Sequence, residues 1–154
     1  MIEADHKLSR DLIKSLGRMV EDDRVYALLS DKLKTNDDKT GMAVADAVVP
    51  YARANTRAVT LVNAMLGHER DKVRRAAIEG VNKNPDLIGD ESVRAALRNG
   101  VASGYQPAIS YAKALAAFGN KDDIAFLREA GESNKGLKTQ TKALQKLLEE
   151  LEAR

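Results

Sequence analysis

The sequence predicts an all-α fold, and three observations lead to that prediction. Apolar residues recur at intervals of three and four along nearly the whole chain, and the strict alternation typical of strands is missing. Alanine occurs 23 times in 154 residues, whereas aromatic residues occur only six times. A core built from such small side chains requires closely approaching backbones, which helices packed side by side provide. Alanine, leucine, lysine, arginine and glutamate also have the highest helix propensities.

Length and composition limit the class of protein further. A chain of 154 residues is expected to form one domain, here residues 1–154. Without cysteine it has no disulfide framework, thiolate metal site or cysteine nucleophile. The longest apolar stretch, Ala43 to Tyr51, is interrupted by Asp46 and Pro50, so we expect no membrane span. The first residues lack a basic region followed by an apolar run, so we expect no secretory signal and a cytoplasmic protein.

The charges are spread evenly along the chain. The 25 basic and 23 acidic residues leave a net charge of +2. Neither a basic arm nor an acidic tail stands out, and both signs are interspersed. Such patterning is typical of solvated helix faces.

The apolar spacing predicts nine helices joined by short loops. Their approximate ranges are 5–20, 22–33, 42–50, 55–66, 71–81, 90–101, 107–118, 122–127 and 137–154. Most are preceded by a side chain that can accept hydrogen bonds from the first backbone N–H groups. The candidates for this capping role are Asp22 or Asp23, Asp37 or Asp38, Asn55 or Thr56, Asp90, and Asp122 or Asp123.

Prolines and glycines mark several boundaries. Pro50 removes a backbone hydrogen bond and is expected to kink or fray the end of the third helix. Residues 82–89, which include Pro85, are expected to form a loop. Pro107 suits the first position of a helix, where its missing N–H costs nothing. Residues 131–136, bounded by glycines, are expected to form a loop before the last helix.

The predicted helices pair into about four antiparallel hairpins. The pairs cover about residues 23–52, 56–82, 91–118 and 122–152, and corresponding positions recur after 31, 36 and 32 residues. Such a period is typical of a short α-solenoid, in which neighbouring hairpins cover each other's apolar faces. In this architecture residues 1–20 and 137–154 form the N-terminal and C-terminal capping helices. A non-repeating helical bundle is the alternative.

One stretch of the chain resembles a repeat of the HEAT family. Residues 59–66 form a first helix rich in leucine and valine, the turn 67–71 ends in aspartate, and the next helix begins with Val-Arg and continues with two alanines. The resemblance implies a right-handed α-solenoid in which the turn aspartate and the early arginine pair along the stack. The structural residues that it implies are Asp71, Val73, Arg74, Ala77 and Gly80.

The resemblance weakens outside residues 55–119. Residues 92–97 echo the Val-Arg motif, and residues 112–119 echo the end of a second helix. The two Val-Arg runs begin only 20 residues apart, so they cannot occupy the same slot of successive repeats. The phase of the repeat across residues 91–105 therefore stays open.

No motif typical of catalysis is found. His6 and His68 each stand alone, and His68 falls in a turn where a solvated side chain is expected. The chain has no glycine-rich phosphate loop, no nucleophile elbow and no calcium-loop spacing. The paired aspartates are better explained as helix caps than as metal ligands. We therefore expect a protein that is not an enzyme and that has no cofactor, catalytic residue or metal site.

The expected function is a non-catalytic scaffold or adaptor that presents a curved helical surface to another protein. The alternative is a nucleic-acid-binding module whose basic residues between 70 and 98 form a stripe that contacts phosphates. Acidic residues interspersed at 69, 71 and 79 offset this charge, and no aromatic residue is interleaved for base stacking. The residues expected to contact a partner are Arg70, Lys72, Arg75, Arg94, Arg98 and Lys113.

Overall fold

The computed structural model describes the backbone of residues 2–118 and 120–154, and side chains from residue 9 onward except at 85, 88 and 119. His6 therefore lies outside the described side chains. Most of the described residues are helical, with ten α-helices, three short 3-10 helices and no strand, which confirms the predicted all-α class. The chain divides into two compact units, Met1–Leu87 and Ile88–Arg154.

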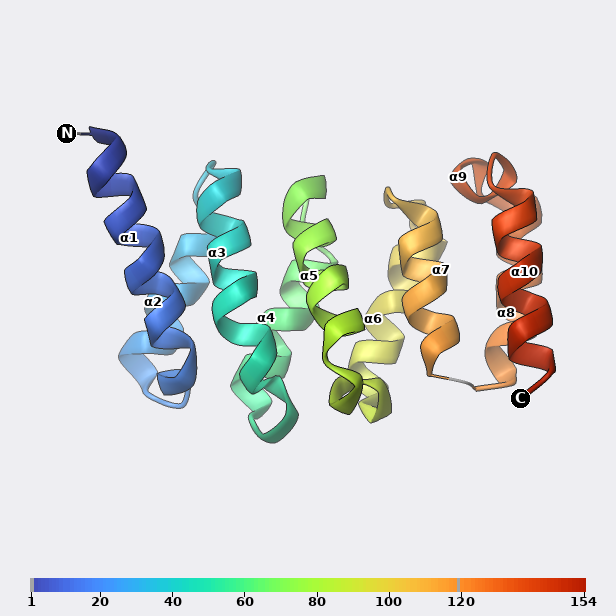
Figure 1. Ribbon diagram of the computed structural model, residues 1–154, viewed down its shortest axis with the longest axis horizontal. Coiled ribbons are helices and arrows are strands. Elements are labelled where there is room, and N and C mark those ends of the chain that lie inside the picture. Colours follow the sequence, from blue (N-terminus) through green and yellow to red (C-terminus); the bar gives the residue numbers. More distant parts are fainter. Residues whose placement is uncertain (1, 119) are drawn as a thin grey trace. The chain divides into compact units, whose positions relative to one another are not determined.

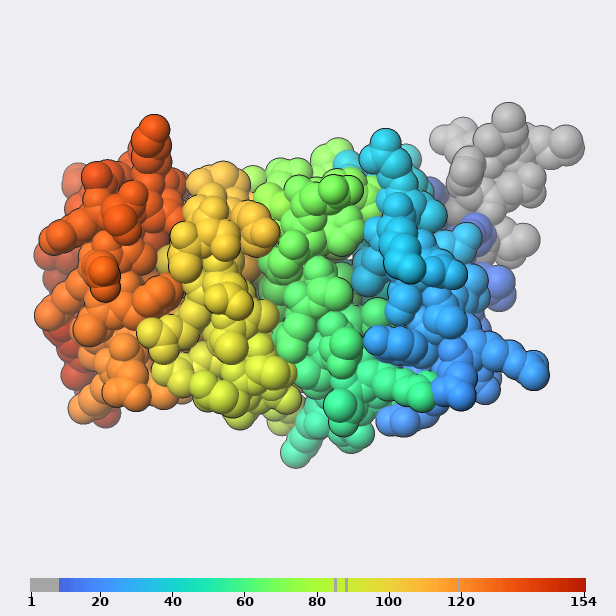
Figure 2. All heavy atoms as spheres, turned by 180° about the vertical axis from the view of Figure 1, so that it is seen from behind, coloured from blue at the N-terminus to red at the C-terminus, as the bar shows by residue number. Residues whose placement is uncertain are grey.

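The first unit arranges its helices in two layers. In Figure 1, α1, α3 and α5 stand side by side in front of α2 and α4, and α3 packs against both α1 and α5. Figure 2 shows the opposite side of this unit, where α2 and α4 appear in blue to green. Its elements are α1 (Ile2–Leu16), η1 (Gly17–Met19), α2 (Asp23–Leu33), α3 (Asp38–Val48), η2 (Val49–Ala54), α4 (Thr56–Leu66) and α5 (Asp71–Lys83), and η3 (Pro85–Gly89) follows.

Close contact between α3 and its neighbours depends on glycine. A Cβ atom added at Gly17 would lie 1.7 Å from the carbonyl oxygen of Ala47, and one added at Gly41 would lie 2.6 Å from Cγ2 of Val73. The side of α3 toward the core is also made of small residues, including Ala43 and Ala47, both almost fully buried. The alanine-rich composition thus serves close helix packing in this unit.

The described residues of the second unit form five α-helices. They are α6 (Glu91–Ala102), α7 (Ala108–Ala117), α8 (Asp122–Ser133), α9 (Lys135–Lys138) and α10 (Thr141–Glu152). Helix α7 packs against α6 and α10. Its fully buried Tyr111 lies so close to Gly100 of α6 that an added Cβ there would be 2.1 Å from the ring.

The structure confirms several of the predicted capping residues. Asp22 accepts hydrogen bonds from the backbone of residues 24 and 25, and Asp37 accepts them from residues 39 and 40. Asn55 accepts one from the backbone of Ala58, and Asp90 accepts two from residues 92 and 93. Each cap satisfies N–H groups that have no partner within the helix.

Some predicted boundaries are wrong. The third helix begins at Asp38, four residues earlier than expected, and Pro50 lies in η2, where the chain continues as a 3-10 helix to Ala54. The predicted loop 82–89 is largely helical, because α5 continues to Lys83 and η3 follows after one residue.

The predicted loop 131–136 and the single last helix are also wrong. Helix α8 continues through Gly131 to Ser133, and a Cβ at Gly131 would lie 2.5 Å from Leu144, so this glycine permits close packing and does not end the helix. The chain after it forms α9 and α10, which are separate helices. Asn134 caps the start of α9, because its side chain accepts hydrogen bonds from the backbone N–H groups of Gly136 and Leu137.

Replacing Gly17 tests the close approach of η1 to α3. We expect Gly17→Ala to lower the free energy of unfolding by about 2 kcal/mol, because the new methyl group meets backbone that must shift. Gly67→Ala is the control, since its nearest atom would be 3.8 Å away, and it should be neutral or stabilising by up to about 1 kcal/mol. Urea unfolding followed by circular dichroism measures both, and equal stability of the two variants would contradict the packing argument.

The cap of α6 gives a pH-dependent prediction. The pKa of Asp90 is lowered from its ordinary value of 3.8, chiefly by the hydrogen bond from the Ser92 hydroxyl and then by two backbone N–H groups. Its stabilising effect is therefore complete above the ordinary value and is lost as the pH falls through the lowered pKa.

We expect Asp90→Ala to cost about 1 kcal/mol at neutral pH and less in strong acid. Asp90→Asn keeps an uncharged cap, so its stability relative to Asp90→Ala should not change with pH. Urea unfolding at both pH values gives these differences, and a gap between wild type and Asp90→Ala that is constant with pH would refute the assignment.

Candidate functional site

The candidate site is a groove on the first unit, between α3 and α5, on the side away from α2 and α4. Its floor consists of apolar or small residues, and its rim is charged on both sides. The floor residues are Met42, Ala45, Val49, Pro50, Ala76 and Gly80. The rim residues are Lys14, Asp46, Lys72, Arg75, Glu79 and Lys83. We call this feature the α3–α5 groove.

Met42 joins this groove to a shallower one between α1 and α3. The second groove shares Lys14, Met42 and Asp46 with the first and adds Arg10, Asp11, Lys39 and Ala43. Met42 is 40% exposed, which is a large exposure for an apolar side chain. Two neighbouring hollows thus meet at one accessible, flexible apolar side chain.

The position of Gly80 sets the depth of the α3–α5 groove. A Cβ added there would lie 3.0 Å from both methyl groups of Val49, which is a tight contact. The backbone of α5 therefore passes close to the start of η2. The groove floor at Gly80 lies directly against Val49, which is a buried core residue. The sequence places Gly80 in the repeat motif, and here it lies against a residue of the preceding hairpin.

Among the described residues that line the two grooves, basic side chains outnumber acidic ones six to three. Several of them form ion pairs: Lys14 with Asp46 at 3.3 Å, Lys72 with Asp38 at 3.2 Å, and Lys83 with Glu79 at 2.6 Å. Each partner in these pairs is at least about one third exposed. Such exposed pairs contribute little to stability, about 0–1 kcal/mol, and can exchange partners at low cost.

Charges also act across the groove. The pKa of Lys83 is raised, first by its hydrogen bond to Glu79 and then by the negative charges of Glu79 and of Asp46 on the opposite side. The pKa of Glu79 is lowered by the same hydrogen bond and by the charge of Lys83. Both groups therefore remain charged at neutral pH.

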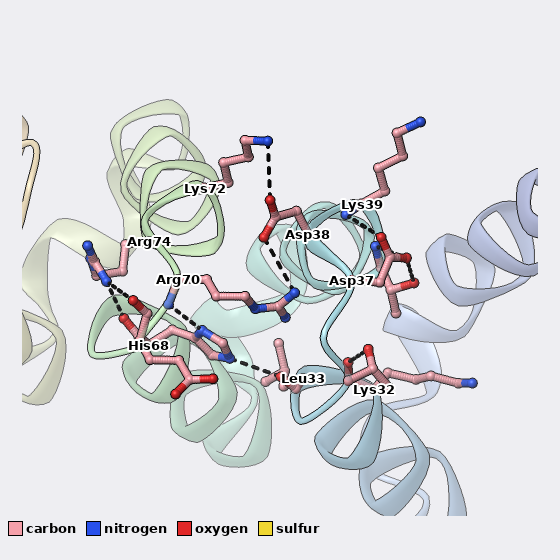
Figure 3. Close-up of polar contacts among 12 residues, drawn as sticks. Lys32, Leu33, Asp37, Asp38, Lys39, His68, Arg70, Lys72 and Arg74 are labelled. Carbon is pink, nitrogen blue, oxygen red and sulfur yellow. Dashed lines mark hydrogen bonds and ion pairs between the residues drawn. The ribbon is translucent and has the colours of Figure 1, made fainter.

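The turns at one end of the groove are held by a polar network (Figure 3). Asp38, the first residue of α3, contacts Nη1 of Arg70 at 3.4 Å and Nζ of Lys72 at 3.2 Å. His68 Nε2 lies 2.9 Å from the carbonyl oxygen of Leu33, and its Nδ1 accepts a hydrogen bond from the backbone N–H of Arg70. Because Nδ1 accepts this hydrogen bond, Nε2 is the ring nitrogen left to donate to the carbonyl oxygen of Leu33.

His68 is therefore not the solvated turn residue that the sequence suggests. Its ring is half-buried and joins the end of α2 to the turn before α5. Arg74, which is 7% exposed, donates to the carbonyl oxygens of His68 and Glu69 in the same turn. Asp71, at the start of the same helix, forms an ion pair with Arg75 at 3.5 Å.

The predicted contact residues are divided between the two units. Lys72 and Arg75 are exposed on the rim of the α3–α5 groove, whereas the Arg70 side chain is only 14% exposed and lies beneath Asp38. Lys113 is exposed on α7 in the second unit.

Arg94 and Arg98 belong to an ion-pair cluster in the second unit. Asp123 is fully buried, and its carboxylate oxygens lie 3.0 and 3.1 Å from Nε and Nη2 of Arg94. Arg98 approaches the same carboxylate at 3.6 Å and stacks over the ring of Phe126. Arg94 is 8% exposed, and its pKa is raised, chiefly by the hydrogen bonds with Asp123. Arg94 is therefore not part of an accessible surface.

Asp123 corrects a further expectation. The sequence suggests that the aspartate pair at 122 and 123 caps a helix, but the residue before α8 is Lys121, and Asp123 is an internal partner of arginine. The residue types alone do not distinguish these roles, since the paired aspartates at 22–23 and 37–38 do supply caps.

The sequence also does not identify the floor residue Met42 as exposed, because its spacing fits the apolar face of the predicted third helix. The composition of α3 does indicate that one of its apolar residues is exposed, since the helix has more apolar residues than one buried face needs.

Other classes of site receive no support from the described residues. Among them, no group of three or more histidine, aspartate or glutamate side chains is placed to hold a metal ion. None of the helices in the described part of the chain is both long and apolar enough to span a bilayer.

The chain matches no protein-family model, no curated protein and no solved structure. The likeness to HEAT repeats therefore rests on the sequence motif alone.

Removing Arg94 tests the buried cluster. We expect Arg94→Met to lower the free energy of unfolding by about 3–5 kcal/mol, because it leaves the buried Asp123 without its main partner. The double variant Arg94→Met with Asp123→Leu should recover part of this loss, since no buried charge remains. Lys113→Met is the surface control and should change stability by less than about 0.5 kcal/mol. Urea unfolding measures all three, and a double variant less stable than Arg94→Met would contradict this account.

Proposed function

We propose that the protein is a non-catalytic cytoplasmic scaffold that binds another protein through the face formed by α1, α3 and α5. The α3–α5 groove carries this proposal. It combines an accessible apolar floor with a charged rim, which is the arrangement of protein interfaces with an apolar centre and a polar edge. Methionine suits such a centre, because its unbranched side chain adapts to the shape of a partner.

The proposed architecture behind this face is a short α-solenoid of HEAT-like hairpins. Its support is a set of contacts within each unit between residues about one hairpin apart. Arg57 contacts Asp23 over 34 residues, Arg70 contacts Asp38 over 32, and His68 contacts Leu33 over 35. In the second unit Asn134 donates to the carbonyl oxygen of Val101 over 33 residues. A near-constant separation is what stacked hairpins produce.

The alternative, nucleic-acid binding, receives less support from the side-chain positions. Of the five basic residues assigned to the predicted stripe, Arg94 is buried with Asp123, and Arg70 is mostly buried beneath Asp38. Lys72, Arg75 and Arg98 remain, and each has a carboxylate partner. A phosphate backbone would have to displace these carboxylates and would leave the apolar floor unused.

Two matched variants test the proposed function. Met42→Asp places a charge in the groove, and Leu28→Asp makes the same change at a residue of α2 that is 41% exposed, almost the same as Met42. We expect cross-linked capture from the source cells, quantified by mass spectrometry, to lose a set of proteins with Met42→Asp and to retain it with Leu28→Asp. Equal capture by wild type and Met42→Asp would refute a partner at this face.

Retention on duplex DNA distinguishes the nucleic-acid alternative. The scaffold proposal predicts weak retention at low salt that does not depend on Arg70 and Arg75. Tight retention that collapses as salt is raised, and that Arg70→Ala with Arg75→Ala abolishes, would replace the scaffold proposal with the alternative.

A further inference from the structure

We propose that the α3–α5 groove receives an acidic amphipathic helix of the partner protein, with its apolar stripe on Met42 and Ala76 and its acidic side facing α5. This inference rests on the proposed function and specifies the chemistry of the partner. It is argued from the shape of the groove, the residue types of its floor and the charges of its α5 side.

The dimensions and floor of the groove suit a short helix. Helix α5 has 13 residues and therefore extends about 20 Å, which an equally straight partner helix matches with about three and a half turns. Small floor residues, above all Ala76 and Gly80, allow another helix to approach closely. Met42 is accessible in this groove and can pack between partner side chains spaced three or four residues apart.

Other peptide conformations fit less well. A polyproline segment docks on grooves lined by aromatic rings, and none of the described residues that line the α3–α5 groove is aromatic. An extended strand docks by hydrogen bonding to an exposed sheet edge, whereas both sides of this groove are helices whose backbone groups are already bonded. The helix-in-groove mode remains.

The charges of the α5 side specify an acidic occupant. Lys72, Arg75 and Lys83 lie on this side, and among the described residues Glu79 is the one acidic residue that α5 contributes to the groove lining. Their partners are carboxylates held in exposed pairs, and the side chains of Lys72, Arg75 and Lys83 are 63%, 56% and 70% exposed. Carboxylates of a docked helix can therefore share or replace these partners with little loss.

The acidic residues of the groove distinguish a helix from a polyanion. Asp46 and Glu79 lie on opposite sides of the apolar floor. A phosphate backbone carries charge at regular intervals and cannot avoid them. A helix can place neutral or basic side chains opposite Asp46 and Glu79 while it directs glutamates toward Lys72 and Arg75.

Three fluorescently labelled helical peptides of about 14 residues test the inference. The first has leucines on one face and glutamates on the other, the second replaces the glutamates with lysines, and the third replaces the leucines with serines. Fluorescence anisotropy measures their binding to the full chain. We expect the acidic leucine peptide to bind at least about tenfold more tightly than the other two, and to weaken as salt is raised.

Groove variants locate the binding. Lys72→Glu with Arg75→Glu should weaken the acidic leucine peptide at least about tenfold and should improve binding of the lysine peptide. Met42→Asp should weaken the acidic leucine peptide at least about fivefold. The controls are Leu28→Asp on α2 and the pair Arg24→Glu on α2 with Lys34→Glu just after it, and both should leave binding of this peptide unchanged. Circular dichroism and urea unfolding of each variant verify that the fold is retained.

The outcomes separate this inference from the proposed function. If the acidic leucine peptide fails to bind, or binds equally to the groove variants, the inference is overturned. Preference for the lysine peptide by the wild-type chain would overturn it as well. In each of these cases the proposed function still stands if Met42→Asp removes captured proteins. If Met42→Asp removes none, both are refuted.

Discussion

The close approach of α3 to the helices on either side is the constraint on which the rest of the first unit depends. Gly17 allows η1 to touch the backbone of Ala47, and Gly41 allows α3 to pack against Val73. With almost no large aromatic residues to fill space, the core is stable only if backbones come this close. The same approach fixes the spacing of the outward sides of α3 and α5. The α3–α5 groove is therefore a consequence of how the core packs.

Paired aspartates at helix starts combine two tasks. Asp22 and Asp37 each cap a helix, while the next residue in each pair, Asp23 or Asp38, contacts an arginine more than 30 residues further along the chain. One short motif thus begins a helix and joins it to the following hairpin. The pair at 122 and 123 departs from this pattern, because Asp123 turns inward to arginines that precede it in the chain.

The sequence predicts the helical class and most helix starts well because these depend on local features. Spacing of apolar residues and a capping side chain act within one or two turns, and Asp22, Asn55 and Asp90 illustrate this. Features set by distant residues are not predictable in this way. Gly131 is predicted to end a helix because its contact with Leu144 cannot be read from the local sequence. His68 is predicted to be solvated because its contact with the carbonyl oxygen of Leu33 cannot be read there either. Met42 is missed for the same reason, since its exposure depends on which sides of α3 its neighbours leave uncovered.

The two kinds of ion pair in this protein separate structural charges from charges available for binding. Around Asp123 the carboxylate is fully buried and the main arginine is almost so, and breaking such a pair leaves a charge that water cannot reach. Along the α3–α5 groove the pairs are exposed and weakly stabilising, so a partner can rearrange them without disturbing the core. Arginine and lysine that look equivalent in the sequence therefore differ in role through burial alone. Lys72 and Arg75 are suited to binding a partner, because each charge is positioned by an exposed ion pair that contributes little to the stability of the fold.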